Sequence, residues 1–207
     1  MFLTGPTFTI CQNRVNARRT SPALLTSSAP LADNACMDFF EIVKQRRSIR
    51  LFADRPVAEE QIERVLETAL AAPSAGNLQA YRIFVVKSNE VRAALTAAAL
   101  GQDCVRTAPV VLVFCTHAAQ AAKKYGERGE RLYTLQDATI ACTFAMLAIA
   151  ALGLATVWVG AFREEAAWKA IGSPEGLVPV AMLPFGYAGE QPEPTFRRSV
   201  DKLVHRL

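Results

Sequence analysis

Apolar residues recur at helical spacing in the first well-patterned part of the chain. Asp38 followed by Glu41 has the spacing of a capping box, and the apolar residues beside it predict a helix over 38–47. A second helix is expected to open at Pro56, and its 3.6-type apolar repeat runs until Pro73 ends it. The loop after Pro73 consists of small and polar residues.

Short runs rich in β-branched and aromatic residues predict strands, at residues 81–86, 110–115, 155–160 and 178–183. Helical patterns separate these runs, at residues 89–100, 134–152 and 164–171. The charged stretch 120–132 carries two glycines and is interpreted as an exposed helix and loop. Strands and helices without regular βαβ alternation indicate an α+β domain.

The span from Ala138 to Phe162 contains no charged residue, and it is long enough to be weighed as a transmembrane helix. Many of its residues are Ala or Thr, Gly153 interrupts it, and the sequence "ATVWVG" that follows is strand-like. A buried helix followed by a strand therefore fits better than a membrane span. A helix that is apolar nearly all round must be covered by its own domain or by a partner subunit.

Residues 1–36 differ from the rest of the chain. They contain several arginines, a single acid, Asp33, and many Ser, Thr and Pro residues without apolar periodicity. This composition is typical of a transit peptide, but a disordered tail, or a start codon wrongly placed upstream of Met37, is favoured. The folded domain is expected to occupy residues 37–207.

Composition narrows the class of protein. The 207 residues are 51% apolar, enough for a sizeable core, and the net charge of +4 falls short of the balance typical of a dedicated nucleic-acid binder. The five cysteines form no C-x-x-C pair, and neither of the two histidines has a partner at ligand spacing. We therefore expect reduced thiols, no metal site and a cytoplasmic setting.

Three arginines and a hydroxyl cluster where the first predicted helix ends, at Arg46, Arg47, Ser48 and Arg50. A basic helix end that complements the helix macrodipole is one interpretation, and spacing alone favours it. A phosphate clamp is the second, because guanidinium and hydroxyl groups bind phosphate oxygens strongly. A nucleic-acid patch is the least favoured, since no other basic cluster with interleaved aromatic residues accompanies it.

The segment "PSAGNLQ", residues 73–79, contains neither a G-x-G-x-x-G fingerprint nor a P-loop. It fits an ordinary turn between helix and strand. The amides of Asn77 and Gln79 also suit the edge of a heterocyclic ring. Arg197 and Arg198 add a second, smaller basic group in the C-terminal tail.

Taken together, four segments in order resemble the FMN-dependent nitroreductase family over about residues 37–207: "RRSIRLF", "AAPSAGNLQAYRIFVV", "LQDATIACTFAMLAIAALGLATVWVGAF", and "LPFGYAGE" with its basic tail. The resemblance implies an α+β homodimer with a central, mainly antiparallel sheet flanked by helices. It also implies two FMN molecules at the dimer interface, each flanked by residues from both subunits.

By position, the resemblance implies the residues that would contact the flavin. The phosphate and ribityl chain would be held by Arg46, Arg47, Ser48, Arg50 and Arg197. The ring system would be flanked by Pro73, Ser74 and Ala75, from the other subunit, with Asn77 and Gln79 at the pyrimidine side. Val159 and Gly160 would turn their backbone toward the reactive edge. Many family members carry an acid where this chain has Val159, and a basic residue where it has Thr195.

The function implied is hydride transfer from NADH or NADPH through FMN to a nitroaromatic, quinone or related electron-poor acceptor, by a ping-pong mechanism. No catalytic side chain is assigned, because the flavin carries the redox chemistry. A flavin-dependent dehydrogenase or enone reductase of the same fold is the nearest alternative. A non-redox module that binds a nucleotide is the alternative from another class.

Overall fold

A four-stranded antiparallel sheet forms the centre of the computed structural model, which describes residues 38–207. Its strand order is β1-β2-β4-β3, with bounds Tyr81–Val86, Val110–Thr116, Val178–Gly186 and Ala155–Thr156 respectively. Every adjacent pair is antiparallel. The expected α+β class and mainly antiparallel sheet are confirmed, and the expectations for residues 1–36 lie outside the described residues.

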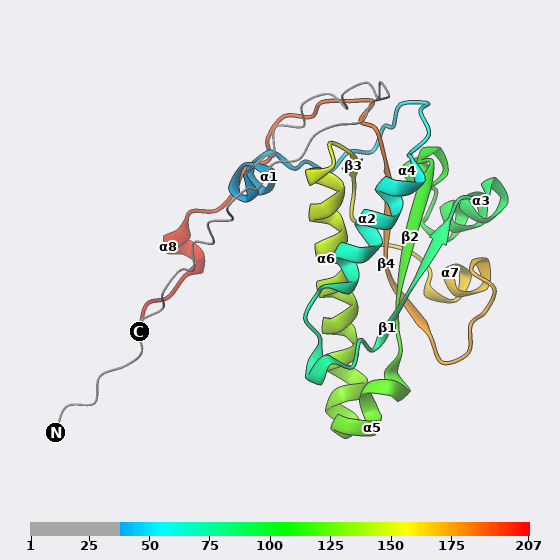
Figure 1. Cartoon of the computed structure of the whole chain (residues 1–207), viewed down its shortest axis with the longest axis vertical. Coiled ribbons are helices and arrows are strands. Elements are labelled where there is room, and N and C mark those ends of the chain that lie inside the picture. The colour runs from blue at the N-terminus through cyan, green and yellow to red at the C-terminus, as the bar shows by residue number, and fades with distance from the viewer. Residues whose placement is uncertain (1–37) are drawn as a thin grey trace, which may run out of the picture. The chain divides into compact units, whose positions relative to one another are not determined.

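The central strand β2 is buried on both faces, and its side chains alternate between two separate apolar clusters. On one face, Val111 and Val113 pack with α3 (Asn89–Ala98), α4 (Asp103–Thr107) and α7 (Glu164–Ala170). On the other face, Leu112 and Phe114 pack with α2 (Glu59–Leu70) and α6 (Thr134–Ala151). Figure 1 shows these helices on the two sides of the sheet. A strand that is buried on both faces needs apolar side chains at successive positions, and the sequence of β2 is apolar in this continuous way.

The starts of the first two helices can be compared with the sequence signals that predict them. In α1 (Phe39–Gln45) the Asp38 carboxylate accepts a hydrogen bond from the Phe40 N–H, so Asp38 is the N-cap. The Glu41 carboxylate binds Gln45 and Lys44, so the second half of the predicted capping box is not formed. Helix α2 begins at Glu59 rather than at Pro56, which corrects the predicted start. There the Gln61 side chain accepts a hydrogen bond from the Ala58 N–H, and Ala58 itself is extended.

The charged stretch 120–132 contains the expected helix, but the expected loop is reduced to a kink at Gly126, where φ is 55° and ψ is −145°. Helix α5 (Ala118–Arg128) continues through one π-helical segment, η2 (Gly129–Tyr133), into α6. A Cβ on Gly129 would lie 2.5 Å from the carbonyl oxygen of Ala121, so only glycine fits where the two segments join. The kink at Gly126 and the missing side chain at Gly129 thus let α5 fold back against η2.

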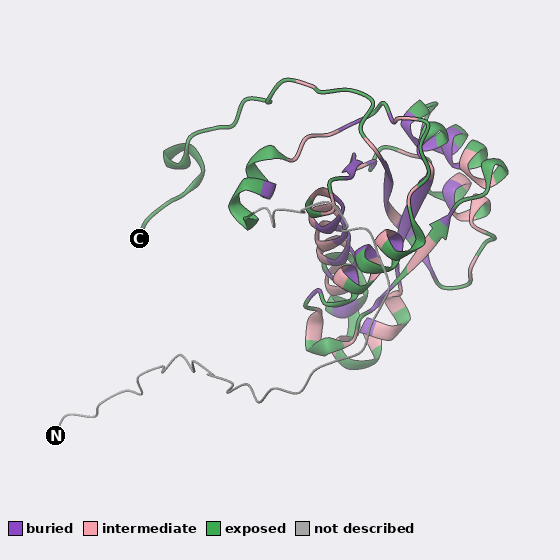
Figure 2. Ribbon diagram, turned by 45° about the horizontal axis from the view of Figure 1, so that its top comes forward, coloured by how far each residue is buried: buried purple, intermediate pink, exposed green. Residues whose placement is uncertain are grey.

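Among residues 38–207, one helical segment, Ala118–Ala151, is long and apolar enough to cross a membrane by length and composition. In the structure its α6 part lies against the sheet, and Ala138, Ala141, Cys142 and Ala145 are buried there. Figure 2 shows α6 with buried and half-buried residues around it. This is the position of a core helix, and the small residues let it pack closely on α2 and the sheet.

The predicted strand over 155–160 is wrong in its extent. Only Ala155–Thr156 forms the ladder with β4, and Val159 makes a single bridge to Met182 further along. Three short elements carried no signal that sequence patterning detects, namely α4, the 3₁₀ turn η1 (Ala75–Asn77) and α8 (Val200–Leu203). Elements of three to five residues are too short for apolar periodicity to appear.

Candidate functional site

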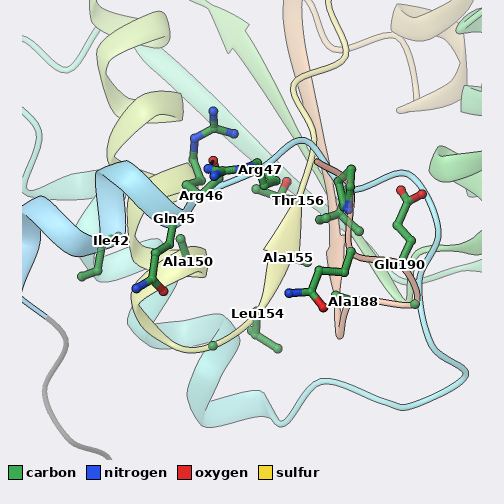
Figure 3. A pocket seen from close by; sticks show the side chains of 15 residues that line it. Ile42, Gln45, Arg46, Arg47, Ala150, Leu154, Ala155, Thr156, Ala188 and Glu190 are labelled. Carbon is green, nitrogen blue, oxygen red and sulfur yellow. Dashed lines mark hydrogen bonds between the residues drawn. The ribbon is translucent and has the colours of Figure 1, made fainter. Parts of the chain in front are cut away.

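An open cavity of about 740 Å³ lies where the turn after α1 meets the end of α6 and the segment that follows β4. Arg46 and Arg47 line it from the turn, Ala150 from α6, and Thr156 from β3. Figure 3 shows these residues around the cavity, with Glu190 at the side of the tail. The cavity thus gathers residues from segments that lie far apart in the sequence, and its volume is in the range of ligand pockets.

The two adjacent arginines have different surroundings. The Arg47 guanidinium donates hydrogen bonds to the carbonyl oxygens of Lys44, at 2.6 Å, and Arg46, at 3.0 Å. Arg47 therefore satisfies carbonyls at the end of α1, as the helix-end interpretation predicts. The Arg46 guanidinium donates no side-chain hydrogen bond to any of the residues that the structure describes.

The pKa of the Arg46 guanidinium is lowered, first by burial and then by the positive charges of Arg197 and Arg47. The charge of the tail arginine Arg197 therefore acts on Arg46. Arg46 and Arg47 line the cavity and Arg197 lies outside its lining, so two like charges at the cavity and a third nearby repel one another, and a bound anion would relieve that repulsion. Their donor chemistry fits a phosphate group.

Backbone pairing holds the arginine segment in place on both sides. Ser48 makes a parallel bridge with Thr156, and the Ile49 N–H donates to the Thr156 carbonyl oxygen at 3.1 Å. The N–H groups of Arg50 and Leu51 both donate to one carboxylate oxygen of Glu190, at 2.6 and 3.1 Å. The segment is thus tied to β3 on one side and to the start of the tail on the other.

The segment 73–79 forms a tight turn with an unusual backbone. Gly76, Asn77 and Gln79 have φ values of 56°, 57° and 49°, in the left-handed region that non-glycine residues rarely adopt. The Gln79 N–H donates to the Ser74 hydroxyl at 3.0 Å, and the Ala75 N–H donates to the Asp137 carboxylate at 2.8 Å. Strained backbone of this kind is typical of ligand-binding turns.

Helix α5 packs directly on this turn. A Cβ on Gly76 would lie 2.4 Å from the Tyr125 hydroxyl and 2.5 Å from the Lys124 amine. The Gln120 side chain donates to the Leu78 carbonyl oxygen at 2.5 Å. Pro73, Asn77 and Gln79 remain exposed, so the turn presents its polar groups to a partner or a ligand.

The two groups of predicted site residues lie at opposite ends of α6. The arginine cavity includes Ala150 near the end of this helix, whereas the 73–79 turn is bound to Asp137 in its first turn. With a rise of 1.5 Å per residue, the two points are about 20 Å apart along the helix. One chain therefore does not bring the two groups together around a single flavin ring.

The remaining predicted residues are placed as follows. Val159 is buried, and its N–H and carbonyl groups are both paired with Met182 at 2.9 Å. Gly160 is exposed beside the Trp158 indole, and its N–H has no acceptor among the described residues. Arg197 is exposed and lines a shallow hollow with Phe196 and other tail residues.

Three residues of this region were missed by the sequence interpretation, namely Thr156, Glu190 and Asp137. Each lies inside or beside a segment that was singled out, but isolated Thr, Glu and Asp residues carry no spacing signal of their own. Only the fold shows that Asp137 meets the 73–79 turn and that Glu190 meets the arginine segment. Among residues 38–207, no group of three or more His, Cys, Asp or Glu side chains is placed to hold a metal ion.

Comparison with known proteins identifies the family. The model of the nitroreductase family matches residues 43–103 and 96–187. A Thermus thermophilus protein named NADH dehydrogenase is 32% identical over 187 residues, covering 77% of this chain and 91% of the relative. A Vibrio harveyi protein named NADPH-flavin oxidoreductase is 30% identical over 172 residues, covering 80% and 72% of the two chains.

Among solved structures, the NADPH:FMN oxidoreductase from Vibrio harveyi complexed with NAD+ has a TM-score of 0.75 to this chain at 27% identity. The match covers 81% of this chain and 76% of that one. The chain belongs to the nitroreductase family. The resemblance stated from the sequence is thereby confirmed.

Proposed function

We propose that this chain is an NAD(P)H-dependent FMN oxidoreductase that reduces nitroaromatic, quinone or related electron-poor acceptors by ping-pong kinetics. The family supports the redox activity, and so do the names of the Vibrio harveyi matches, NADPH-flavin oxidoreductase and NADPH:FMN oxidoreductase. FMN, when bound, supplies the hydride chemistry. The residues of this chain supply binding and position, and none is proposed to be catalytic.

The observation that carries the proposal is the guanidinium cluster at the cavity. Arg46 lacks a hydrogen-bonded carbonyl or carboxylate among the described residues, and it feels the charges of Arg47 and Arg197. A phosphate in the cavity would pair with Arg46, and with Arg197 if the tail closes toward it. Ser48 and Arg50 belong to the arginine segment but do not line the cavity. Guanidinium groups form paired, charge-assisted hydrogen bonds with phosphate oxygens.

The second copy of a homodimer would complete the site. Because the arginine segment and the 73–79 turn lie about 20 Å apart along α6, one chain offers each half of the site in a different place. In a two-fold dimer, a contact from residue i of one subunit to residue j of the other is always repeated as a contact from j to i, so the turn of each subunit can meet the arginines of the other. Pro73, Ser74 and Ala75, with Asn77 and Gln79, would then flank the ring system bound by the partner's arginine segment.

Apolar residues at both ends of the described chain support this dimer. Phe39 and Phe40 of α1 are 56% and 75% exposed, and Phe196 in the tail is 88% exposed. Further exposed apolar residues lie along the same tail, at Val200, Leu203, Val204 and Leu207. Large exposed side chains gathered on two segments are typical of surfaces that a partner covers. Burial against a second copy would also cover the half-buried face of α6.

The proposed setting is a soluble, cytoplasmic protein. The three cysteines that the structure describes, Cys104, Cys115 and Cys142, are buried and unpaired. Burial raises the pKa of each thiol, and that of Cys115 rises to about 12. The thiols therefore stay protonated and unreactive at neutral pH, as expected of packing residues in a reducing compartment.

The experiment is a flavin assay followed by kinetics. Purified chain should carry FMN that denaturation releases, and steady-state rates with NADH or NADPH and a nitroaromatic or quinone acceptor should give parallel double-reciprocal lines. Protein that lacks flavin and takes up none when FMN is added would favour the nucleotide-binding module instead. Flavin that NAD(P)H cannot reduce, but that a saturated carbonyl compound reduces, would favour the dehydrogenase, whereas flavin that NAD(P)H reduces and only an enone reoxidises would favour the enone reductase.

A further inference from the structure

Asp137 is a buried carboxylate with no role in the proposed function. Its side chain is 2% exposed, and it lies in the first turn of α6. One oxygen, Oδ1, accepts the hydrogen bond from the Ala75 N–H at 2.8 Å. The other, Oδ2, is buried and has no hydrogen-bond partner within the described residues. Carboxylates are rarely buried with an unpaired oxygen because desolvation disfavours the charged group.

The backbone that Asp137 holds is the left-handed turn of residues 73–79. Asn77 and Gln79 are non-glycine residues with positive φ, which a chain adopts only when its surroundings enforce it. The Ser74 hydroxyl closes the turn by accepting from the Gln79 N–H, and Gln120 binds the Leu78 carbonyl from α5. Asp137 is the contact that ties the start of this turn to α6.

We propose that Asp137 is a positioning residue of the flavin site: by accepting the Ala75 N–H it fixes the turn that presents Asn77 and Gln79. This inference rests on the proposed function, because it takes the turn to be part of the flavin site. The oxygen that accepts the hydrogen bond from Ala75 holds the turn, and the negative charge of the carboxylate is not required for this. A polar side chain that keeps this acceptor should therefore keep the turn in place.

The substitutions separate these roles. Asp137→Ala removes the acceptor, whereas Asp137→Asn keeps an oxygen toward Ala75 and places an amide where Oδ2 has no partner. We expect Asp137→Ala to weaken FMN binding roughly ten- to a hundredfold, as loss of a hydrogen bond to a charged group does. Asp137→Asn should restore the affinity to within about threefold of the parent, because the acceptor is retained.

A second variant tests the same contact from its other side. Ala75→Pro removes the N–H that donates the hydrogen bond to Asp137 and leaves the Asp137 carboxylate in place. The preceding residue, Ser74, has φ of −140° and ψ of 158°, a conformation that a residue before proline readily adopts. We expect Ala75→Pro to weaken FMN binding as Asp137→Ala does. This variant also keeps the test available if Asp137→Ala fails to fold.

The matched control is Thr134→Val, one turn earlier on the same helix. Thr134 is also buried, but its hydroxyl binds the Ala80 carbonyl and the His117 N–H outside the turn. It should lower the melting temperature and leave the FMN dissociation constant unchanged. Affinity is measured by the quenching of flavin fluorescence, and hydrogen exchange at the Ala75 amide gives a readout that needs no flavin.

The outcomes are distinguishable. Faster exchange at Ala75 in Asp137→Ala, weaker FMN binding and rescue by Asn support the positioning role. Parent-like affinity in Asp137→Ala, or equal losses in the Ala and Asn variants, overturn it while leaving the proposed function intact. A parent protein that binds no FMN overturns both.

Discussion

The different surroundings of Arg46 and Arg47 predict different consequences when each is removed. Arg46→Ala should lower the affinity for FMN, because its guanidinium has no protein acceptor and lies near Arg47 and Arg197. A lost charge-assisted contact is worth about 1.5–3 kcal/mol, so the dissociation constant should rise roughly ten- to a hundredfold. The free protein should keep its stability, since removing one of three like charges relieves repulsion.

Arg47→Ala should show the opposite pattern. It removes the two hydrogen bonds to the carbonyls of Lys44 and Arg46 at the end of α1. We expect a loss of about 1 kcal/mol in the free energy of unfolding, which is a drop of about 2–4 °C in melting temperature for a chain of this size. FMN affinity should change less than in Arg46→Ala.

Riboflavin, which lacks the phosphate, completes the assay. Isothermal titration of each variant with FMN and with riboflavin isolates the contact between Arg46 and the phosphate as a coupling energy. Arg46→Ala should bind riboflavin as the parent does. The matched control is Arg198→Ala, which removes an arginine next to Arg197 in the tail. Equal losses of FMN and riboflavin affinity in Arg46→Ala, or a larger loss of FMN in Arg47→Ala, would refute the assignment.

Three further results are expected. Phe114→Ala, in the fully buried centre of β2, should cost about 3–5 kcal/mol of stability by chemical denaturation, and a cost under about 1 kcal/mol would contradict the two-sided core. Burial raises the pKa of Cys115 to about 12, whereas a thiol in the unfolded chain has a pKa of about 8.5. The free energy of unfolding should therefore be unaffected by this thiol below about pH 8.5 and should fall as the pH rises toward 12. Cys115→Val should make that fall shallower, and an identical slope would argue against the buried thiol. Deleting residues 1–36 should leave the melting temperature and flavin content unchanged, and aggregation of the shortened chain would show that these residues are structural.

Periodicity predicted the core of the fold because burial dictates it directly. The runs at β1, β2 and β4 are apolar and β-branched, and each forms a strand where its pattern predicts. The uncharged stretch of α6 is a core helix, as its Ala-rich composition indicates. Failures occurred where the side-chain pattern does not decide the backbone, as at Gly126, where a kink followed by a π-helical segment replaces the expected loop.

The candidate site was predictable only in part. The clustered arginines indicate an anion site, and the order of the motifs indicates the family, but neither observation distinguishes the role of Arg46 from that of Arg47. That distinction depends on where each guanidinium lies relative to the carbonyls at the end of α1. The role of Asp137 depends on a contact between residues 62 positions apart, which no local pattern contains.

A hybrid dimer tests most directly whether the flavin site is assembled from two copies of the chain. One subunit would carry Arg46→Ala, and the other would carry Asn77→Asp, which tolerates the left-handed backbone but places a carboxylate where an amide is proposed. The two versions would be co-expressed with different tags and the hybrid isolated by tandem purification. Its FMN content would be compared with that of each variant homodimer.

If each site combines the arginines of one subunit with the turn of the other, the hybrid contains one intact site and one doubly altered site. The predicted result is about one tightly bound FMN per hybrid dimer, with each variant homodimer binding weakly at both sites. If the arginines and the turn of the same chain form the site, both sites of the hybrid are altered. A hybrid that binds FMN no better than the two variant homodimers would contradict the shared site.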